Sequence, residues 1–388
     1  MPIIKFKRFN KPQTLKLIGR DLLARFFDKF KEDFDTRSLP LPPPELADGD
    51  YFRSLSHLLM CPEGLPDRLN EALFAIDEMA SPRGQELLEA AVALAEPPLR
   101  FQADSSPEDI ALQVWLAAPA LLARTHNAQR LRRLTAFQYA GSNLPKEQRP
   151  AATQPDTRLT GALAAALDPW FANNHRGEQT TKIELYSIEG EEWFLVRHGD
   201  TFTRAPKVQQ QKTEIIHFRP ERDDVVVYSP ERDEIRINAR TKGERDLYLE
   251  QFGLHLGARG DYFCHRDMYT LEPLRREGID SLDARDVPGI KKVLLREIEA
   301  ALENGNHEVI IRAAADIFHP TTNNSVHPEP VPERGTLTRA IFEFQFTDSA
   351  KPRLVELRPP NILKFGRRCD AQLVQQFLAR RGFRIGRK

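Results

Sequence analysis

The stretch from residue 181 to residue 253 most constrains the fold, because it holds several short β-forming runs and one capped helix. Val, Ile and aromatic residues are concentrated in these runs. Glu189-Gly190-Glu191 separates the first two runs, so they predict a β-hairpin. A turn rich in Ser, Pro and Asp separates the last two runs and predicts a second hairpin. The predicted strands are residues 183–188, 193–198, 214–218, 224–228 and 234–238, and a polar segment precedes the third of them.

A helix is predicted directly after the second hairpin. Thr241 and Glu244 have the spacing of a capping box, in which each side chain accepts a hydrogen bond from the backbone N–H of the other residue. Apolar residues then recur at helical spacing, and Gly253 is a typical helix end. We therefore expect a compact sheet followed by a helix.

The N-terminal part of the chain predicts helices. Residues 13–34 carry apolar side chains along one side and Lys or Arg elsewhere, which is typical of a basic amphipathic helix. The prolines of residues 39–44 cannot continue that helix and predict a connector. Residues 51–139 show helical periodicity throughout. Residues 143–156 predict a break, and residues 159–171 predict a further helix that leads into the sheet.

Strands return in the C-terminal part. Residues 291–313 fit either a helix or a hairpin with its turn at Glu303-Asn304-Gly305-Asn306, and we favour the hairpin. Residues 340–346 and 354–357 predict a closing β-pair. Residues 370–381 predict a last helix, which Gly382 ends.

The expected fold class is α+β, with a helical N-terminal domain, a β-rich mixed domain and a basic C-terminal helix. The expected divisions are a basic amphipathic helix at 1–38, a proline-rich connector at 39–50, a helical domain at 51–175, a β-rich α+β domain at 176–350 and a basic strand-helix segment at 351–388.

The composition excludes several classes of protein. The 56 basic residues balance 56 acidic ones, which argues against a protein that coats nucleic acid generally. The three cysteines are widely separated, which excludes a disulfide scaffold and indicates a reducing compartment. No apolar run is long enough to span a membrane, and the N-terminus lacks the apolar core of a signal peptide. We therefore expect a cytoplasmic protein without membrane association, and the sequence does not indicate its oligomeric state.

Charge is segregated along the chain. Residues 1–31 hold nine Lys or Arg and two acids, and residues 351–388 hold eleven Lys or Arg and two acids. Residues 38–99 hold eleven acids and three bases. Two interpretations follow: the basic ends dock on the acidic segment of the same chain, or they contact phosphate or an acidic partner.

The second hairpin carries a candidate metal site. Asp224 begins one strand, and Glu234-Ile235-Arg236 lies on the next. This pattern resembles the core of restriction-type nucleases over about thirty residues, in which an acid on one strand and an acid-x-lysine on its neighbour bind a divalent metal. The resemblance implies Asp224 and Glu234 as ligands of Mg²⁺ or Mn²⁺, with Arg236 in the position of the catalytic lysine. Arginine departs from that pattern, because it stays protonated and cannot act as a base. Charges that keep an edge of the hairpin soluble are the simpler interpretation.

Basic residues interleaved with aromatic ones follow the predicted sheet and recur at the C-terminus. Such a pattern fits a surface that contacts phosphates while bases stack, although neighbouring acids also fit a salt-bridged surface. The candidate nucleic-acid contacts are Arg197, Arg219, Arg236, Arg240, Lys242, Arg367, Arg368, Arg380 and Arg381.

The remaining histidines and cysteines carry no diagnostic motif. His198-Gly199-Asp200 is interpreted as turn chemistry, and Cys264 and His265 lack the paired cysteines of a zinc site. No phosphate-binding glycine loop, dinucleotide fingerprint or nucleophile elbow occurs.

The resulting functional hypothesis is a non-enzymatic component of an intracellular assembly that associates with nucleic acid or binds a protein partner, without a cofactor. The alternative hypothesis is the Mg²⁺- or Mn²⁺-dependent nuclease with Asp224 and Glu234.

Overall fold

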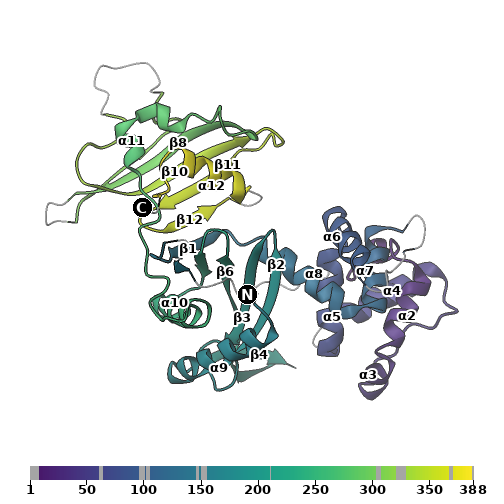
Figure 1. Ribbon diagram of the computed structural model, residues 1–388. Helices are drawn as coiled ribbons and strands as arrows, with labels where there is room; N and C mark the ends of the chain where they lie inside the picture. The colour runs from purple at the N-terminus through teal and green to yellow at the C-terminus, as the bar shows by residue number, and fades with distance from the viewer. Residues whose placement is uncertain are drawn as a thin grey trace. The chain divides into compact units, whose positions relative to one another are not determined.

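The computed structural model describes residues 8–60, 64–95, 101, 105–145, 148–149, 155–209, 211–302, 307–319, 329–366 and 370–386. The chain divides into two compact units, residues 1–132 and residues 133–388. An α+β fold is confirmed, because helices fill the first unit and a large antiparallel sheet dominates the second (Figure 1). No helix in the described parts of the chain is long and apolar enough to cross a membrane.

Unit 1 is a bundle of short helices around an aromatic-rich core. Phe26, Phe27, Phe30 and Phe34 are all at most 2% exposed, and Trp115 stacks on Phe30. These contacts bury the apolar side predicted for residues 13–34. The helices described in this unit are α1 (Pro12–Leu15), α2 (Arg20–Asp28), α3 (Lys31–Thr36), α4 (Asp48–Leu59), α5 (Asp67–Met79), α6 (Pro82–Ala93), α7 (Pro107–Ala117) and α8 (Pro119–Leu131).

The single helix predicted at residues 13–34 is wrong, since this stretch forms α1, α2 and α3. Gly19 precedes α2 in an extended conformation, and its backbone N–H donates to Asp109 Oδ1 at 2.8 Å. A contact with a residue ninety positions away therefore replaces a helical hydrogen bond, which no local periodicity could reveal. The proline-rich connector runs along the surface of this unit, where Leu39, Leu41 and Leu46 pack against the core.

Basic residues near the N-terminus dock on acids of the same unit. The backbone N–H of Arg8 donates to Asp77 Oδ1 at 2.9 Å, and its guanidinium lies 3.0 Å from Glu108. Arg20 pairs with Asp48 at 2.7 Å. Asp77 and Asp48 both belong to the acidic stretch 38–99, so these pairs support docking within the chain for this end.

Unit 2 is built on a ten-stranded antiparallel sheet with the order β2-β3-β6-β7-β1-β12-β11-β10-β8-β9. The predicted hairpins β2–β3, β6–β7 and β8–β9 and the β10–β11 pair are confirmed. The strands are β1 (Ala136–Gly141), β2 (Lys182–Ile188), β3 (Glu191–Gly199), β6 (Glu221–Ser229), β7 (Glu234–Asn238), β8 (Ile290–Ala301), β9 (Val309–Ala313), β10 (Thr336–Phe346), β11 (Arg353–Arg358) and β12 (Ile362–Phe365).

The central strand β1 contradicts the prediction that residues 51–139 are helical throughout. It pairs with β7 on one side and with β12 on the other. The side chain of Asn361 donates to the carbonyl of Tyr139 at 2.9 Å, and Asn238 donates to the carbonyl of Ala136 at 2.6 Å. Pairing on both edges imposes the extended conformation on a stretch of six residues that is too short to show a clear period.

Two helices cover one face of the first half of the sheet. Helix α9 (Thr157–Asn173) and helix α10 (Lys242–Gly257) pack on a core that includes Phe194, Val226 and Ile235. The capping box of Thr241 and Glu244 is present, but α10 continues to Gly257, beyond the end predicted at Gly253. Short helices, α11 (Glu272–Arg276) and a 3₁₀ turn at Gly278–Leu282, lead into the second half.

Helix α12 (Ala371–Arg380) covers the opposite face of the second half. Its Gln375 donates to Tyr139 Oη at 3.1 Å, whereas the next residue, Ala140, belongs to the core under α9 and α10. Because successive residues of a strand point to opposite faces, α12 lies on the other side of the sheet from α9 and α10. Its Phe377 packs edge-on against Phe344 of β10. Residues 351–388 therefore supply strands and a helix to the same unit as residues 176–350.

The capping box predicts a measurable contribution to the stability of unit 2. We expect Thr241→Ala to lower the free energy of unfolding by about 1 kcal/mol, because it leaves an N-terminal N–H of α10 without its acceptor. Tryptophan fluorescence during urea unfolding measures this in a Trp115→Phe background, in which the two remaining tryptophans, Trp170 and Trp193, both lie in unit 2.

The matched control is Thr213→Ala, at an exposed position. It should change the stability by less than about 0.5 kcal/mol. Equal unfolding midpoints for the two variants would show that the cap contributes nothing.

Candidate functional site

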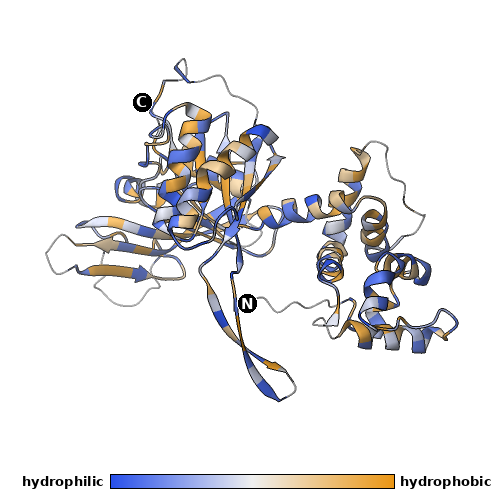
Figure 2. Ribbon diagram, turned by 90° about the horizontal axis from the view of Figure 1, so that it is seen from below, coloured by the Kyte–Doolittle hydropathy of each residue, from blue (hydrophilic) through white to orange (hydrophobic). Residues whose placement is uncertain are grey.

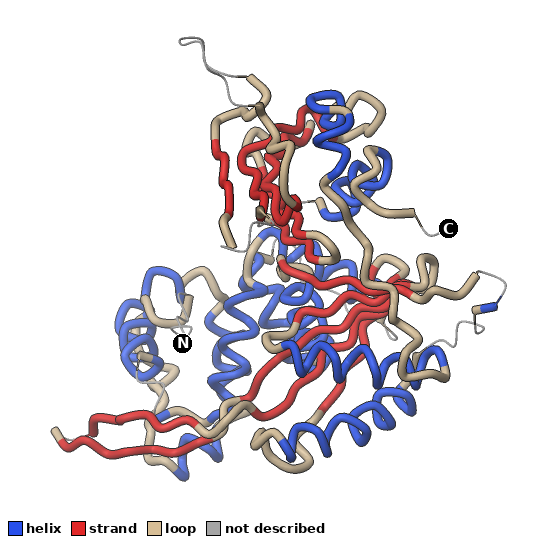
Figure 3. Tube along the Cα trace, turned by 90° about the vertical axis from the view of Figure 1, so that its left-hand side faces the viewer, coloured by secondary structure: helices blue, strands red, loops and turns tan. Residues whose placement is uncertain are grey.

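A two-stranded arm projects from unit 2 (Figure 2, Figure 3). It is formed by the segment that connects β3 to β6 in the chain. Its strands, β4 (Thr203–Gln209) and β5 (Lys212–Phe218), pair only with each other. Strand β5 was predicted, but the polar segment before it was not recognised as β4. Strand β4 was missed because its residues are mostly polar or basic and none of them faces a core, so the segment resembles a loop in the sequence.

Apolar side chains on the arm are exposed. Val208 is 74% exposed and Phe202 is 64% exposed, and Ile215 and Ile216 are about two fifths exposed. An isolated two-stranded ribbon is only marginally stable in water, and exposed apolar side chains on both of its faces are typical of a binding element.

The two faces of the arm each combine a cation with an apolar residue. The register pairs Arg204 with His217 and Pro206 with Ile215 on one face. It pairs Lys207 with Glu214 and Ala205 with Ile216 on the other. Lys212 is exposed near the tip. The described part of the arm carries three cations, Arg204, Lys207 and Lys212, and one acid, and no salt bridge of these three cations is found among the described residues.

The root of the arm is held by a buried polar cluster on β3, β6 and α10. His198 is the last residue but one of β3, and its Nε2 lies 3.2 Å from Asp224 Oδ2 on β6. Tyr248 on α10 donates to the same carboxylate oxygen at 2.9 Å. The ring of Phe171 stacks on His198 with centroids 4.1 Å apart. Burial and the adjacent Asp224 carboxylate raise the pKa of Tyr248 well above its ordinary value, so the phenol stays a donor.

Two arginines neutralise most of the negative charge at this root. Arg176 lies 2.6 Å from Glu244 and 3.5 Å from Asp200, and Arg222 lies 3.2 Å from Asp200 and 3.6 Å from Asp224. Burial alone would raise the pKa of Asp200, but the N–H of Thr201 and the two guanidinium groups outweigh it, so that pKa lies below its usual range.

His198, Asp224 and Glu244 form the one group of three candidate metal ligands that meets among the described residues. The sequence singled out Asp224 but paired it with Glu234. His198 was interpreted as turn chemistry, and Glu244 was recognised only as a helix cap. The register of β3 against β6 brings His198 and Asp224 together, since Val196 lies opposite Asp224 and places His198 diagonally beside it.

The structure does not bring Asp224 and Glu234 together. Glu234 lies opposite Ser229, five positions along β6 from Asp224, which corresponds to about 17 Å. The two side chains also point to opposite faces of the sheet, because an odd number of positions separates them. These two carboxylates therefore cannot share one metal ion in this fold.

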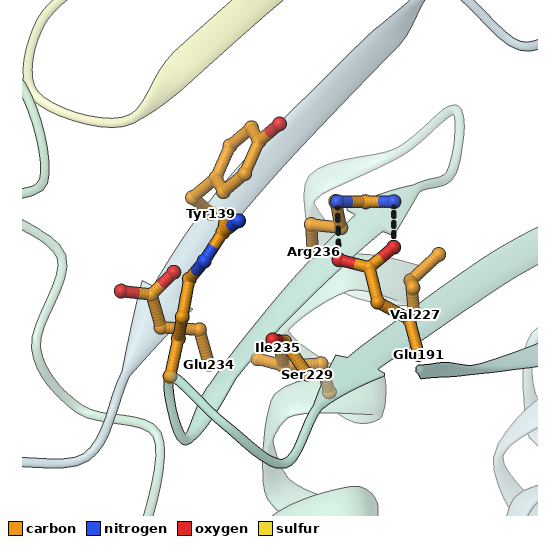
Figure 4. Close-up of a pocket in the computed structure, with 8 residues that line it drawn as sticks. Tyr139, Glu191, Val227, Ser229, Glu234, Ile235 and Arg236 are labelled. Carbon is orange, nitrogen blue, oxygen red and sulfur yellow. Dashed lines mark hydrogen bonds and ion pairs between the residues drawn. The ribbon is translucent and has the colours of Figure 1, made fainter. Parts of the chain in front are cut away.

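Glu234 and Arg236 belong to a second polar cluster (Figure 4). Arg236 makes two hydrogen bonds with Glu191, at 2.9 and 2.6 Å, and its guanidinium also lies over the ring of Trp193. Glu234 pairs with Arg384. The cavity between these side chains measures about 10 Å³, room for about one water molecule, so this cluster holds the sheet together and offers no ligand site.

Most arginines predicted to contact nucleic acid are engaged inside unit 2. Arg197 lies 3.2 Å from both Glu184 and Asp223, and Arg219 donates to the backbone carbonyls of His175 and Asp200. Arg380 and Arg381 pair with Asp286. Arg240, 69% exposed, and Lys242, also exposed, remain accessible. Arg367 and Arg368 lie outside the described residues.

Comparison with protein-family models gives no match for this chain, and comparison with curated proteins finds no similar sequence.

The buried cluster predicts that substitutions of two adjacent aspartates, Asp223 and Asp224, differ greatly in their effect on stability. We expect Asp224→Ala to destabilise unit 2 by about 3–5 kcal/mol, because it leaves Arg222 and His198 without their buried acceptor. Asp223→Ala removes a side chain that is 28% exposed and should cost about 0–1 kcal/mol.

Urea unfolding of the Trp115→Phe background again measures both variants. Asp224→Asn is the third variant. It keeps the size of the side chain and one acceptor oxygen, so its loss of unfolding free energy should lie between those of the two alanine variants. Similar losses for the two alanine variants would mean that the buried cluster stabilises unit 2 no more than a surface ion pair does.

Proposed function

We propose that this protein is a non-enzymatic DNA-binding protein whose β4–β5 arm enters the major groove of a duplex. The observation that carries the proposal is a free ribbon with cations and apolar side chains on both faces. A partner that covers only one face of the arm would leave the other face exposed to water, whereas a groove surrounds both.

The dimensions of the groove suit this arm. The major groove of B-DNA is about 12 Å wide and admits a two-stranded β-ribbon. The major groove of duplex RNA is deep and narrow and does not admit one. Arg204, Lys207 and Lys212 would contact phosphates along the groove, and Val208 and Ile215 would contact thymine methyl groups.

Two cations at the root extend the same surface. Arg240 lies 3.9 Å from Asp200, the acid that also binds Arg176 and Arg222, and Lys242 begins α10. Both would contact the phosphate backbone beside the inserted arm. The buried cluster of His198, Asp224 and Glu244 would hold the root rigid, and a rigid root reduces the entropy lost on binding.

Charge reversal on the arm tests this proposal. We expect Arg204→Glu with Lys207→Glu and Lys212→Glu to weaken binding to duplex DNA by at least about 100-fold at low salt. The slope of the logarithm of the binding constant against the logarithm of the salt concentration should become less steep by up to about 2.7, because each lost phosphate contact contributes about 0.9 to its magnitude. Fluorescence anisotropy with a labelled duplex over a series of salt concentrations measures both quantities.

The control is Lys291→Glu with Lys292→Glu and Lys351→Glu, which makes the same change in net charge at exposed positions of the same unit. A general electrostatic effect would weaken binding equally in the two triple variants and would contradict the arm as the binding element.

The duplex should be recovered uncut after incubation with Mg²⁺ or Mn²⁺. A single strand of equal length should bind at least about tenfold more weakly, because it has no groove. Absence of any binding to duplex DNA at low salt would refute the proposal.

A further inference from the structure

Both ring nitrogens of His198 face acceptor oxygens. Nδ1 lies 2.8 Å from the carbonyl oxygen of Gly199, and Nε2 lies 3.2 Å from Asp224 Oδ2. A neutral imidazole carries one N–H, so one of these two contacts would place two lone pairs against each other. A cation at Nε2, either a proton or a metal ion, makes both contacts favourable when Asp224 is ionised.

A third ligand converges on the same point. One oxygen of Glu244, one ring nitrogen of His198 and one oxygen of Asp224 all lie within 4.8 Å of one another. The Glu244 side chain is fully buried, and its Oε1 contacts Arg176 at 2.6 Å but accepts no hydrogen bond of good geometry among the described residues. Ligand atoms of a tetrahedral zinc ion lie about 3.3 Å apart, close to the separation of His198 Nε2 and Asp224 Oδ2.

The surrounding hydrogen bonds are those of an organised metal site. A ligating histidine typically donates its other N–H to a backbone carbonyl, and the Gly199 carbonyl occupies that position. Tyr248 donates to Asp224, and the backbone N–H of Thr241 donates to Glu244 Oε2 at 2.7 Å. Each of the three ligands therefore has an outer partner that fixes its orientation.

We propose that His198, Asp224 and Glu244 bind a divalent transition-metal ion of the zinc class. The ion joins the end of β3, the start of β6 and the first turn of α10, and it thereby fixes the root of the β4–β5 arm. Its role is structural, because all three ligands are buried. Metal binding does not depend on DNA binding, so this proposal and the proposed function can fail separately.

Metal analysis of the intact wild-type protein is the first test. Protein purified from zinc-supplemented cells should contain one zinc ion per chain by mass spectrometry of the elements. Removal with a chelator should lower the unfolding midpoint of unit 2 in the Trp115→Phe background, and added zinc should restore it. Cobalt added to the metal-free protein should give the visible absorption of a tetrahedral site with nitrogen and oxygen ligands.

Variants and an independent spectroscopic measurement complete the test. His198→Ala and Glu244→Gln should lose the bound metal, whereas His217→Ala, at an exposed position on the arm, should keep it. If the two ligand variants do not fold, the ¹⁵N chemical shifts of His198 in the wild type decide the question. A shift typical of metal-bound Nε2 supports the proposal. An imidazolium shift in a protein that binds zinc only at millimolar concentrations overturns it and shows that a proton occupies Nε2.

Discussion

The pairing of β1 on both of its edges is the constraint on which unit 2 depends. Six residues, Ala136–Gly141, supply the only ladder that joins the strands from β2 to β7 with the strands from β12 to β9 in the described sheet. Tyr139 at its centre is 2% exposed, packs edge-on against Tyr269 and accepts a hydrogen bond from Gln375 of α12. Without β1, strands β7 and β12 would each become an exposed edge of the sheet.

The offset of the covering helices follows from the same strand. Ala140 faces the core under α9 and α10, and Tyr139 faces α12. Each half therefore buries one face under its own helices. The polar cluster of Glu191, Arg236 and Glu234 occupies the face that α9 and α10 leave uncovered. There Glu191 accepts two hydrogen bonds from the Arg236 guanidinium, which also lies over the ring of Trp193.

Paired buried charges support the arm at the point where it leaves the sheet. A ribbon without a core of its own transmits its orientation only through its root, and at this root His198, Asp224, Glu244, Arg176 and Arg222 are mutually paired. Breaking one member of such a cluster leaves an unpaired buried charge, so the cluster holds one geometry. Rigid support below and exposed cations above are the two features that connect this fold to the proposed DNA binding.

The sequence by itself determined the elements whose signal is local. Alternating β-forming runs gave the hairpins β2–β3 and β6–β7, and the spacing of Thr241 and Glu244 gave the start of α10. Tertiary structure decided the rest, because pairing and burial depend on residues far apart in the chain. It made β1 a strand, divided residues 13–34 into three helices and placed Asp224 beside His198 and Glu244 instead of Glu234. It also separated the arginines that neutralise buried acids from the cations of the arm, a distinction that residue type alone does not contain, since every arginine carries the same charge.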